Sequence, residues 1–182
     1  MHEIEIKAKV NNLNEVKDKL EKLGCHFSDP LIQKDFVYWE EGVDYDHIRP
    51  GANFCRIRET GGRIIFTLKQ RRSNQLDCIE KEVVIDNTQA MIDILKLMKF
   101  YEMLQMSKTR TKCQYNDYEI CLDQVEGLGD FIEVEKMSDD DGETVQEELK
   151  DFLIGLKISP DNIITKGYDS LIHERNLNNG KS

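Results

Sequence analysis

The chain opens on a segment in which charged and apolar side chains strictly alternate. Glu3, Glu5 and Lys7 take every second position between residues 2 and 10, and Ile or Ala residues stand between them. A period of two is typical of a β-strand, whose successive side chains point to opposite faces. The pattern therefore predicts a first strand with two carboxylates and an ammonium group on one face.

The same kind of alternation, or a run of β-branched and aromatic residues, predicts seven more strands. They cover residues 33–40, 53–59, 63–70, 79–86, 103–114, 118–125 and 131–136. Gly61-Gly62 and Asn116-Asp117 separate two pairs of these strands, and such dipeptides are typical of tight hairpin turns. About eight strands with short connections indicate an antiparallel sheet that closes into a barrel.

Three or four helices complete the predicted fold. The first begins at Asn12 as its N-cap and ends at Gly24, and Thr88 is expected to cap the second. A third ends near Leu156, and a short one follows Gly167. The fold class is α+β and mainly β: an eight-stranded antiparallel barrel with external helices. We expect one domain over residues 1–175 and a polar, disordered tail over 176–182.

Charged residues of both signs recur on the strand faces opposite the apolar ones. The acids are Glu3, Glu5, Asp123, Glu133 and Glu135, with Glu80 and Glu82 as further candidates, and the bases are Lys7, Arg56, Arg58, Lys69, Lys81, Lys108 and Arg110. Each pair taken alone is equally typical of a solvated strand face. Because the apolar faces are expected to pack against external helices, the joint pattern predicts a barrel with a charged interior.

The two sets of charges favour complementary ligands. Converging carboxylates suit a hard divalent cation such as Mg²⁺ or Mn²⁺. Several Arg and Lys side chains suit a polyanion, and guanidinium groups match phosphate oxygens. Together they predict a metal–triphosphate site, in which catalysis consists mainly of positioning the substrate and neutralising its charge.

Composition narrows the candidate partners and the compartment. The 182 residues carry a formal net charge of −10, which argues against a nucleic-acid or acidic membrane partner. The five cysteines are scattered without a Cys-x-x-Cys pair, so we expect reduced thiols in a cytoplasmic protein. No apolar run is long enough to span a membrane. The polar stretch 41–52 is expected to be a loop, either a lid over the ligand or a plain connection.

The ordered set of charged motifs resembles the CYTH superfamily, the triphosphate tunnel metalloenzymes. The resemblance runs from residue 3 to about 172 and rests on Glu3-x-Glu5-x-Lys7, Arg56-x-Arg58, Thr67-Leu68-Lys69, Glu80-x-Glu82, Lys108-x-Arg110, Asp123 and Glu133-x-Glu135. It implies an eight-stranded antiparallel tunnel. The implied metal ligands are Glu3, Glu5, Asp123, Glu133 and Glu135. The implied triphosphate-binding residues are Lys7, Arg56, Arg58, Lys69, Lys81, Lys108, Arg110 and Lys166, and Lys7, Arg110 and Asp123 are expected to act in catalysis.

Within that superfamily, the segment from Asp123 to Glu135 looks most like the class IV adenylyl cyclase-like branch. The resemblance implies conversion of ATP to cyclic AMP and pyrophosphate with Mg²⁺ or Mn²⁺. Two alternatives stay open: an inorganic or thiamine triphosphatase using the same site, and a non-catalytic polyphosphate- or nucleotide-binding module. The expected partner is a small-molecule triphosphate, and a homodimer is a candidate assembly.

Overall fold

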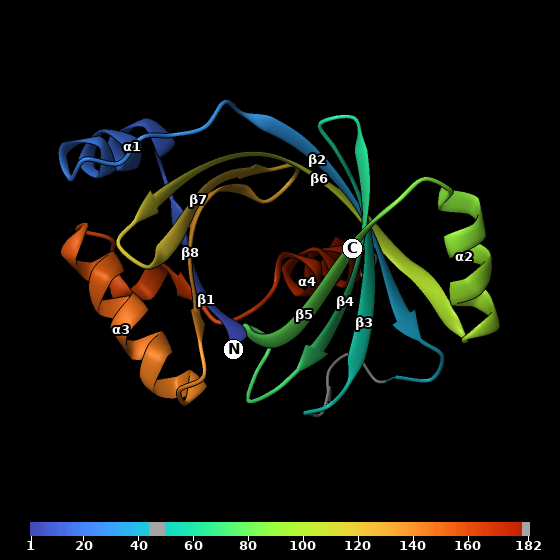
Figure 1. Ribbon diagram of the computed structural model, residues 1–182. Coiled ribbons are helices and arrows are strands. Elements are labelled where there is room, and N and C mark those ends of the chain that lie inside the picture. Colours follow the sequence, from blue (N-terminus) through green and yellow to red (C-terminus); the bar gives the residue numbers. More distant parts are fainter. Residues whose placement is uncertain (44–49, 180–182) are drawn as a thin grey trace.

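Antiparallel strands close into a barrel with helices on its outside, as viewed along the barrel in Figure 1. The computed structural model describes residues 1–43 and 50–179. The barrel strands are β1 (His2–Val10), β2 (Leu31–Glu40), β3 (Asn53–Thr60), β4 (Arg63–Arg71), β5 (Asp77–Ile85), β6 (Phe100–Tyr115), β7 (Tyr118–Val125) and β8 (Gly129–Ser138).

The strand order around the barrel is β5-β4-β3-β2-β6-β7-β8-β1. β1 is antiparallel to β8 over its whole length and closes the barrel through Glu3 opposite Cys78 and Ile4 opposite Asp77 of β5. A short strand, β9 (Ile163–Ile164), pairs antiparallel with Lys7 and Ala8 of β1. The predicted eight-stranded antiparallel barrel is confirmed.

Both predicted hairpin turns are present, and their backbone conformation explains the residues found there. Gly61 and Gly62 have φ angles of 53° and 74° between β3 and β4, and Asn116 has a φ of 53° between β6 and β7. Positive φ at both central positions, as at Gly61 and Gly62, belongs to the tight turn whose twist matches the flanking strands. In the second turn Asn116 alone has a positive φ. Glycine reaches this region without steric cost, and asparagine tolerates it better than most residues.

Four helices accompany the barrel: α1 (Leu13–Lys22), α2 (Thr88–Leu97), α3 (Gly142–Gly155) and α4 (Tyr168–Asn179), with a 3₁₀ turn at Pro160–Asn162. The predicted N-cap of α1 is confirmed, because Asn12 Oδ1 accepts a hydrogen bond from the Asn14 amide at 3.0 Å. The cap predicted for α2 was wrong by one residue. Asn87 accepts from the Ala90 amide at 2.9 Å, and Thr88 is already helical. An amide oxygen at Asn87 caps the helix as well as a hydroxyl would.

The apolar faces of the strands point outward and form the core against the helices. α1 and α3 cover β1, β7 and β8, where Leu20 and Leu149 lie fully buried against Ile4 and Ile132. α2 covers the β2–β4 side through Leu95. Burying this surface is the main favourable contribution to folding. It also forces the opposite, charged faces into the barrel, as the alternation predicted.

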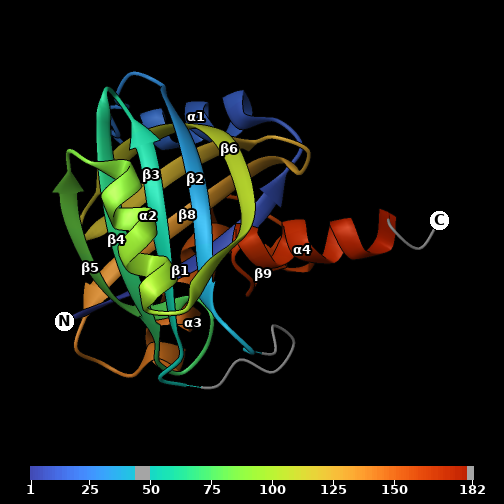
Figure 2. The same cartoon turned by 90° about the vertical axis from the view of Figure 1, so that its right-hand side faces the viewer.

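α4 begins at one mouth of the barrel and leads away from it, as Figure 2 makes clear. The helix predicted after Gly167 is confirmed, and it continues through residues 176–179, which the sequence placed in a disordered tail. Residues 180–182 and the larger part of the predicted 41–52 loop, residues 44–49, lie outside the described residues.

The cysteine and membrane predictions can be compared with the described part of the chain. All five cysteines are buried and free, which agrees with the prediction of reduced thiols. Among residues 1–43 and 50–179, no helix has both the length and the apolar character that crossing a membrane requires.

Candidate triphosphate and metal site

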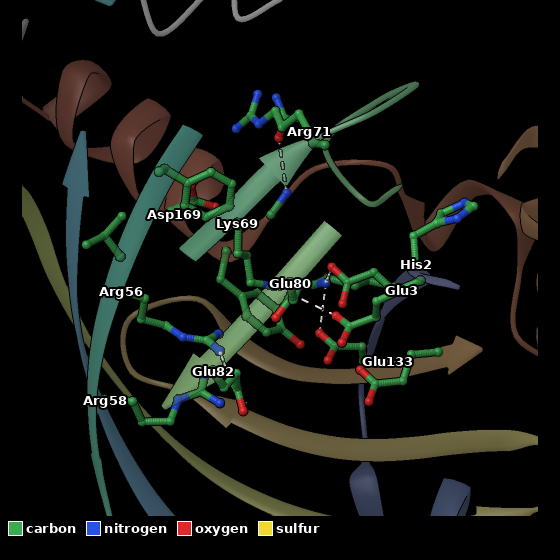
Figure 3. Close-up of a pocket in the computed structure, with 18 of the residues that line it drawn as sticks. His2, Glu3, Arg56, Arg58, Lys69, Arg71, Glu80, Glu82, Glu133 and Asp169 are labelled. Atoms are coloured by element: carbon green, nitrogen blue, oxygen red, sulfur yellow. Dashed lines mark hydrogen bonds and ion pairs between the residues drawn. The ribbon is translucent and has the colours of Figure 1, made fainter. Parts of the chain in front are cut away.

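A cavity of about 410 Å³ occupies the inside of the barrel and is lined mostly by charged side chains (Figure 3). Most residues singled out in the sequence line it: Glu3, Glu5, Lys7, Arg56, Arg58, Lys69, Lys81, Lys108, Arg110, Glu133 and Glu135. They come from six of the barrel strands, β1, β3, β4, β5, β6 and β8. The cavity therefore exists because distant segments of the chain turn their charged faces toward one axis.

Three carboxylates form an acidic cluster on one side of the cavity. Oxygens of Glu3, Glu5 and Glu135 all lie within 4.8 Å of one another. Burial, and then the charge of Glu133, raise the pKa of Glu5. Burial, and then the charges of Glu3 and Glu133, raise the pKa of Glu135 well above its usual value. Like charges at this spacing repel one another. Lys7 pairs with Glu5 and Lys69 lies 3.8 Å from Glu3, but these cations offset the negative charge of the cluster only in part, since the pKa of Glu5 is still raised.

A hard divalent cation fits this cluster. Carboxylate oxygens are the ligands that Mg²⁺ and Mn²⁺ prefer, and a cation here would offset the repulsion that raises both pKa values. Glu3, Glu5 and Glu135 are therefore the residues that could hold the predicted metal ion. A further group, Glu119, Cys121 and Glu135, lies beside it. Glu119, however, is already paired with Lys112, which makes this second group a poorer cation site.

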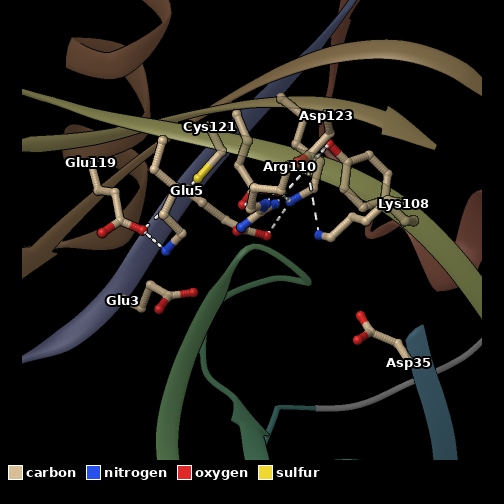
Figure 4. A network of polar contacts seen from close by, with 12 residues as sticks. Glu3, Glu5, Asp35, Lys108, Arg110, Glu119, Cys121 and Asp123 are labelled. Carbon is tan, nitrogen blue, oxygen red and sulfur yellow. Dashed lines mark hydrogen bonds and ion pairs between the residues drawn. The ribbon is translucent and has the colours of Figure 1, made fainter. Parts of the chain in front are cut away.

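A second set of charges forms a buried network deeper in the barrel, drawn in Figure 4. Arg110 donates two hydrogen bonds to Asp123, at 2.7 and 2.5 Å, and a third to Glu133 at 2.7 Å. Lys7 bridges the network to the acidic cluster, because its Nζ contacts Glu133 at 2.8 Å and also pairs with Glu5.

The network gives Asp123 and Glu133 a different environment from the acidic cluster. Burial favours the neutral form of Glu133, but the charges of Arg110 and Lys7 outweigh it and hold its pKa well below the usual value. For Asp123, Arg110 and Lys108 likewise outweigh burial and lower the pKa. Both carboxylates were predicted as metal ligands. The structure places them against cations, so their role as metal ligands stays a prediction.

The opposite wall of the cavity carries Arg56, Arg58 and Lys69. Arg58 is held by two hydrogen bonds to the buried Asp35, at 2.7 and 2.8 Å. Burial would raise the pKa of Asp35, but Arg58 lowers it, so this pair is fully ionised at neutral pH. Asp35 was not singled out in the sequence. Its alternation with aromatic residues inside the predicted strand 33–40 was the available signal.

The other two cations on this side of the cavity, Arg56 and Lys69, pair with glutamates. Arg56 lies 3.1 Å from Glu82, and Lys69 pairs with Glu80 and lies 3.8 Å from Glu3. Glu80 and Glu82 lie on β5, which pairs with β4, and Glu3 lies on β1. Because Glu82 is about half exposed, its ion pair with Arg56 stabilises little, and Arg56 can exchange it for a phosphate oxygen. The pair of Lys69 and Glu80 is largely buried.

Two cations expected at the site are placed differently. Lys81 is exposed and stands opposite Leu68, which packs on the outer face of the barrel, so strand alternation turns its side chain away from the cavity it borders. Lys166 is about half exposed and pairs with Glu174 of α4. It does not line the cavity described by residues 1–43 and 50–179, because β9 and the start of α4 carry it past the mouth.

Tyr168, at the start of α4, is a lining residue that the sequence motifs did not single out for a role. Its ring lies 5.1 Å from Lys7 Nζ and 4.9 Å from Lys108 Nζ, and its hydroxyl donates to Asp123 Oδ2 at 2.9 Å. An aromatic face attracts a nearby ammonium group. The tyrosine therefore positions both lysines and one carboxylate of the buried network.

Lys108 is expected to make anion binding depend on pH. Burial, together with the like charge of Arg110, lowers its pKa to about 8. The ammonium form of Lys108, which attracts phosphate, is therefore fully populated well below pH 8 and is lost as the pH rises through 8. We expect affinity for tripolyphosphate to fall over that range by at most about tenfold per pH unit, measured by titration calorimetry from pH 6.5 to 9.5.

The matched control for this prediction is Lys108→Arg, which keeps its charge over the whole range. Its affinity profile should contain only the titration of the ligand and lack the added decrease above pH 8. Profiles of the same shape for the two proteins would show that Lys108 does not supply the titrating charge.

Comparison with known proteins identifies the family to which the barrel belongs. Residues 1–168 match the CYTH domain family. The chain belongs to the CYTH family. A CYTH relative from Methanocaldococcus jannaschii, provisionally named an adenylate cyclase, is 37% identical over 172 residues, which are 92% of this chain and 97% of the relative.

Solved structures of other proteins share the barrel fold. The PH1819 protein of Pyrococcus horikoshii superposes with a TM-score of 0.77 at 26% identity, over 95% of this chain and 99% of that one. A Hippeastrum protein, provisionally named an adenylyl cyclase and described as having a dominant triphosphatase activity, has a TM-score of 0.61 at 16% identity. That match covers 92% of this chain and 91% of the other, and shows a shared fold.

Proposed function

We propose that this CYTH protein is a divalent-metal-dependent enzyme that cleaves a phosphoanhydride bond of a nucleoside triphosphate, as a class IV adenylyl cyclase-like enzyme. The observation that carries the proposal is that one cavity is lined both by a carboxylate cluster and by six cationic side chains. These six, together called the cationic wall, are Lys7, Arg56, Arg58, Lys69, Lys108 and Arg110. A pure anion-binding module gains nothing from the carboxylates, which repel its ligand.

The chain's own residues are suited to bind and orient the substrate. Arg58 and Arg110 are each held rigidly by a buried carboxylate, so their remaining donors can meet phosphate oxygens with little loss of entropy. Lys7 and Lys108 add point charges along the same path. A metal ion at Glu3, Glu5 and Glu135 would neutralise negative charge on the triphosphate and polarise its phosphoryl oxygens.

In the cyclase reaction the ribose 3′-oxygen attacks the α-phosphorus, the bond from that phosphorus to the bridging oxygen breaks, and pyrophosphate leaves. The proton of the 3′-hydroxyl passes to a base or to solvent. Support for this reaction comes from the relative that is 37% identical. The apolar lining residues Val37, Phe54 and Met106 also offer contact to an organic group.

Hydrolysis is the second candidate, with inorganic or thiamine triphosphate as substrate. The cations of the wall would contact phosphates alone, so they would bind a triphosphate whatever is attached to it. Water would attack the terminal phosphorus, and orthophosphate would leave. The same metal ion and cationic wall serve both reactions. The five free thiols are consistent with either activity in the cytoplasm.

Product analysis distinguishes the two reactions. We expect ³¹P NMR of the protein with ATP, in Mg²⁺ and separately in Mn²⁺, to reveal pyrophosphate and a cyclic phosphodiester. Orthophosphate in their place, formed from ATP or from tripolyphosphate, would establish the hydrolase instead. No product from either substrate with either metal would contradict an enzymatic function.

A further inference from the structure

One carboxylate in the cavity is not accounted for by the metal cluster or by the ion-pair network. Asp169, in the first turn of α4, lines the cavity and is 9% exposed (Figure 3). Its Oδ2 is buried and has no hydrogen-bond partner among residues 1–43 and 50–179. A buried carboxylate oxygen without a donor is unfavourable, which points to a ligand that supplies one.

The position of Asp169 is fixed by its neighbours. Gln75 Oε1 accepts hydrogen bonds from the Gly167 amide at 3.2 Å and from the Ser170 hydroxyl at 2.6 Å. The carboxylate lies so close to Gly167 that a Cβ there would come within 2.2 Å of Asp169 Oδ1. These contacts hold the start of α4, and with it the carboxylate, against the cavity.

Apolar side chains gather beside the start of α4, because Ile172, three residues after Asp169, belongs to the same apolar cluster as Val37 and Phe54. Val37, Phe54 and Met106 line the same cavity, and Tyr168 precedes Asp169 directly. Phe54 stacks on Trp39 with ring centroids 5.1 Å apart, and the Arg71 guanidinium lies over both rings. This part of the cavity offers apolar and aromatic contacts, which suit a ring system better than a phosphate chain.

The negative charge of Asp169 argues against phosphate as its ligand, and its position argues against a metal ion. A carboxylate repels phosphate oxygens, so Asp169 is unsuited to contact the triphosphate itself. Within the described chain it also lies outside both carboxylate groups that could hold a cation. The remaining partner is a neutral or cationic donor, an O–H or N–H group, on the organic part of the substrate.

We infer that Asp169 is a specificity-determining residue that accepts a hydrogen bond from the sugar or base of a nucleoside triphosphate. The inference rests on the proposed function, because it takes the cationic wall as the triphosphate site. Asp169 thereby distinguishes an organic triphosphate from inorganic tripolyphosphate, which has no such donor. A site that hydrogen-bonds a substrate donor discriminates strongly against an analogue that lacks it.

The test compares the dissociation constants of ATP and of tripolyphosphate, measured by titration calorimetry without metal so that no turnover intervenes. For Asp169→Asn we expect ATP to bind about 5- to 10-fold more weakly, because the amide keeps an acceptor oxygen but loses the charge that roughly doubles the strength of the hydrogen bond. Tripolyphosphate should bind as well as before, or better, because a negative charge has been removed. The change in the ratio of the two constants is the diagnostic result.

A matched control separates this role from a structural one. Glu143 is an exposed acid in the first turn of α3, and Glu143→Gln removes the same charge from the same position in a helix, away from the cavity. It should change neither constant. Equal weakening of both ligands in Asp169→Asn, an unchanged ratio, or a wild-type protein that does not bind ATP would overturn the inference. Failure of the proposed function appears separately, as the absence of product in the ³¹P experiment.

Discussion

Replacing Glu135 with glutamine is expected to reduce metal-dependent turnover by about 10²- to 10³-fold, the typical cost of losing one group that stabilises transition-state charge. Carboxylate oxygens of Glu135, Glu3 and Glu5 lie within 4.8 Å of one another. Burial, and then the charges of Glu3 and Glu133, raise the pKa of Glu135 well above the usual value. An amide in its place removes one anionic ligand of the cation that the cluster would bind. The measurement is the initial rate with ATP at several concentrations of Mg²⁺ and Mn²⁺.

The expected loss has two further signatures. The apparent affinity for the metal should fall, whereas thermal stability without metal should hold or rise, because the substitution relieves repulsion among three carboxylates. The matched control is Glu59→Gln, on the exposed outer face of β3, which should keep wild-type rates. Undiminished turnover in Glu135→Gln would remove the acidic cluster from the mechanism.

Replacing Arg110 with methionine is expected to lower the free energy of unfolding by about 3–5 kcal/mol, the typical cost of breaking a buried ion pair by removing one partner. Arg110 donates to Asp123 and to Glu133, and all three side chains are at least 94% buried. Without the guanidinium, two carboxylates stay buried against Lys7, Lys108 and the Tyr168 hydroxyl. Urea unfolding followed by circular dichroism measures the change.

The contribution of Arg110 to stability is also expected to depend on pH. The network holds the pKa of Asp123 and of Glu133 below the usual values, so it stabilises the fold above the unfolded pKa values of these carboxyls and less as the pH falls below them. The variant should lose that dependence. Lys150→Met, at an exposed ion pair with Glu147, is the control and should change stability little. Equal stability of Arg110→Met and wild type at pH 7 would contradict the network's role.

The two predictions concern two kinds of carboxylate inside one barrel. Glu3, Glu5 and Glu135 repel one another and have room for a cation, whereas Asp123 and Glu133 are already balanced by Arg110 and Lys7. The first group is suited to bind a ligand ion. The second is suited to hold cationic side chains in fixed positions, which is what recognition of a flexible polyphosphate requires.

Local sequence was sufficient for most of the fold. Alternation with a period of two, or a run of β-branched and aromatic residues as in 33–40, located all eight barrel strands, and Gly61-Gly62 and Asn116 marked tight turns between them. These features depend only on neighbouring residues, because side-chain direction in a strand and backbone preference in a turn are local properties. The cap of α2 was misplaced by one residue since Asn87 and Thr88 are both competent caps, and the choice depends on where the preceding strand ends.

The same alternation determined which charges enter the barrel, because apolar faces must be buried and a strand has only two faces. It did not determine which charges meet. Strand register places Asp123 against Arg110 and Asp35 against Arg58. Register also places Lys81 opposite Leu68 on the outer face. The path of β9 and α4 carries Lys166 beyond the mouth. Asp169 entered the cavity for the same reason. Ion pairing falls off within a few ångströms, so only the tertiary structure could separate the carboxylates that are neutralised from those that can bind a cation.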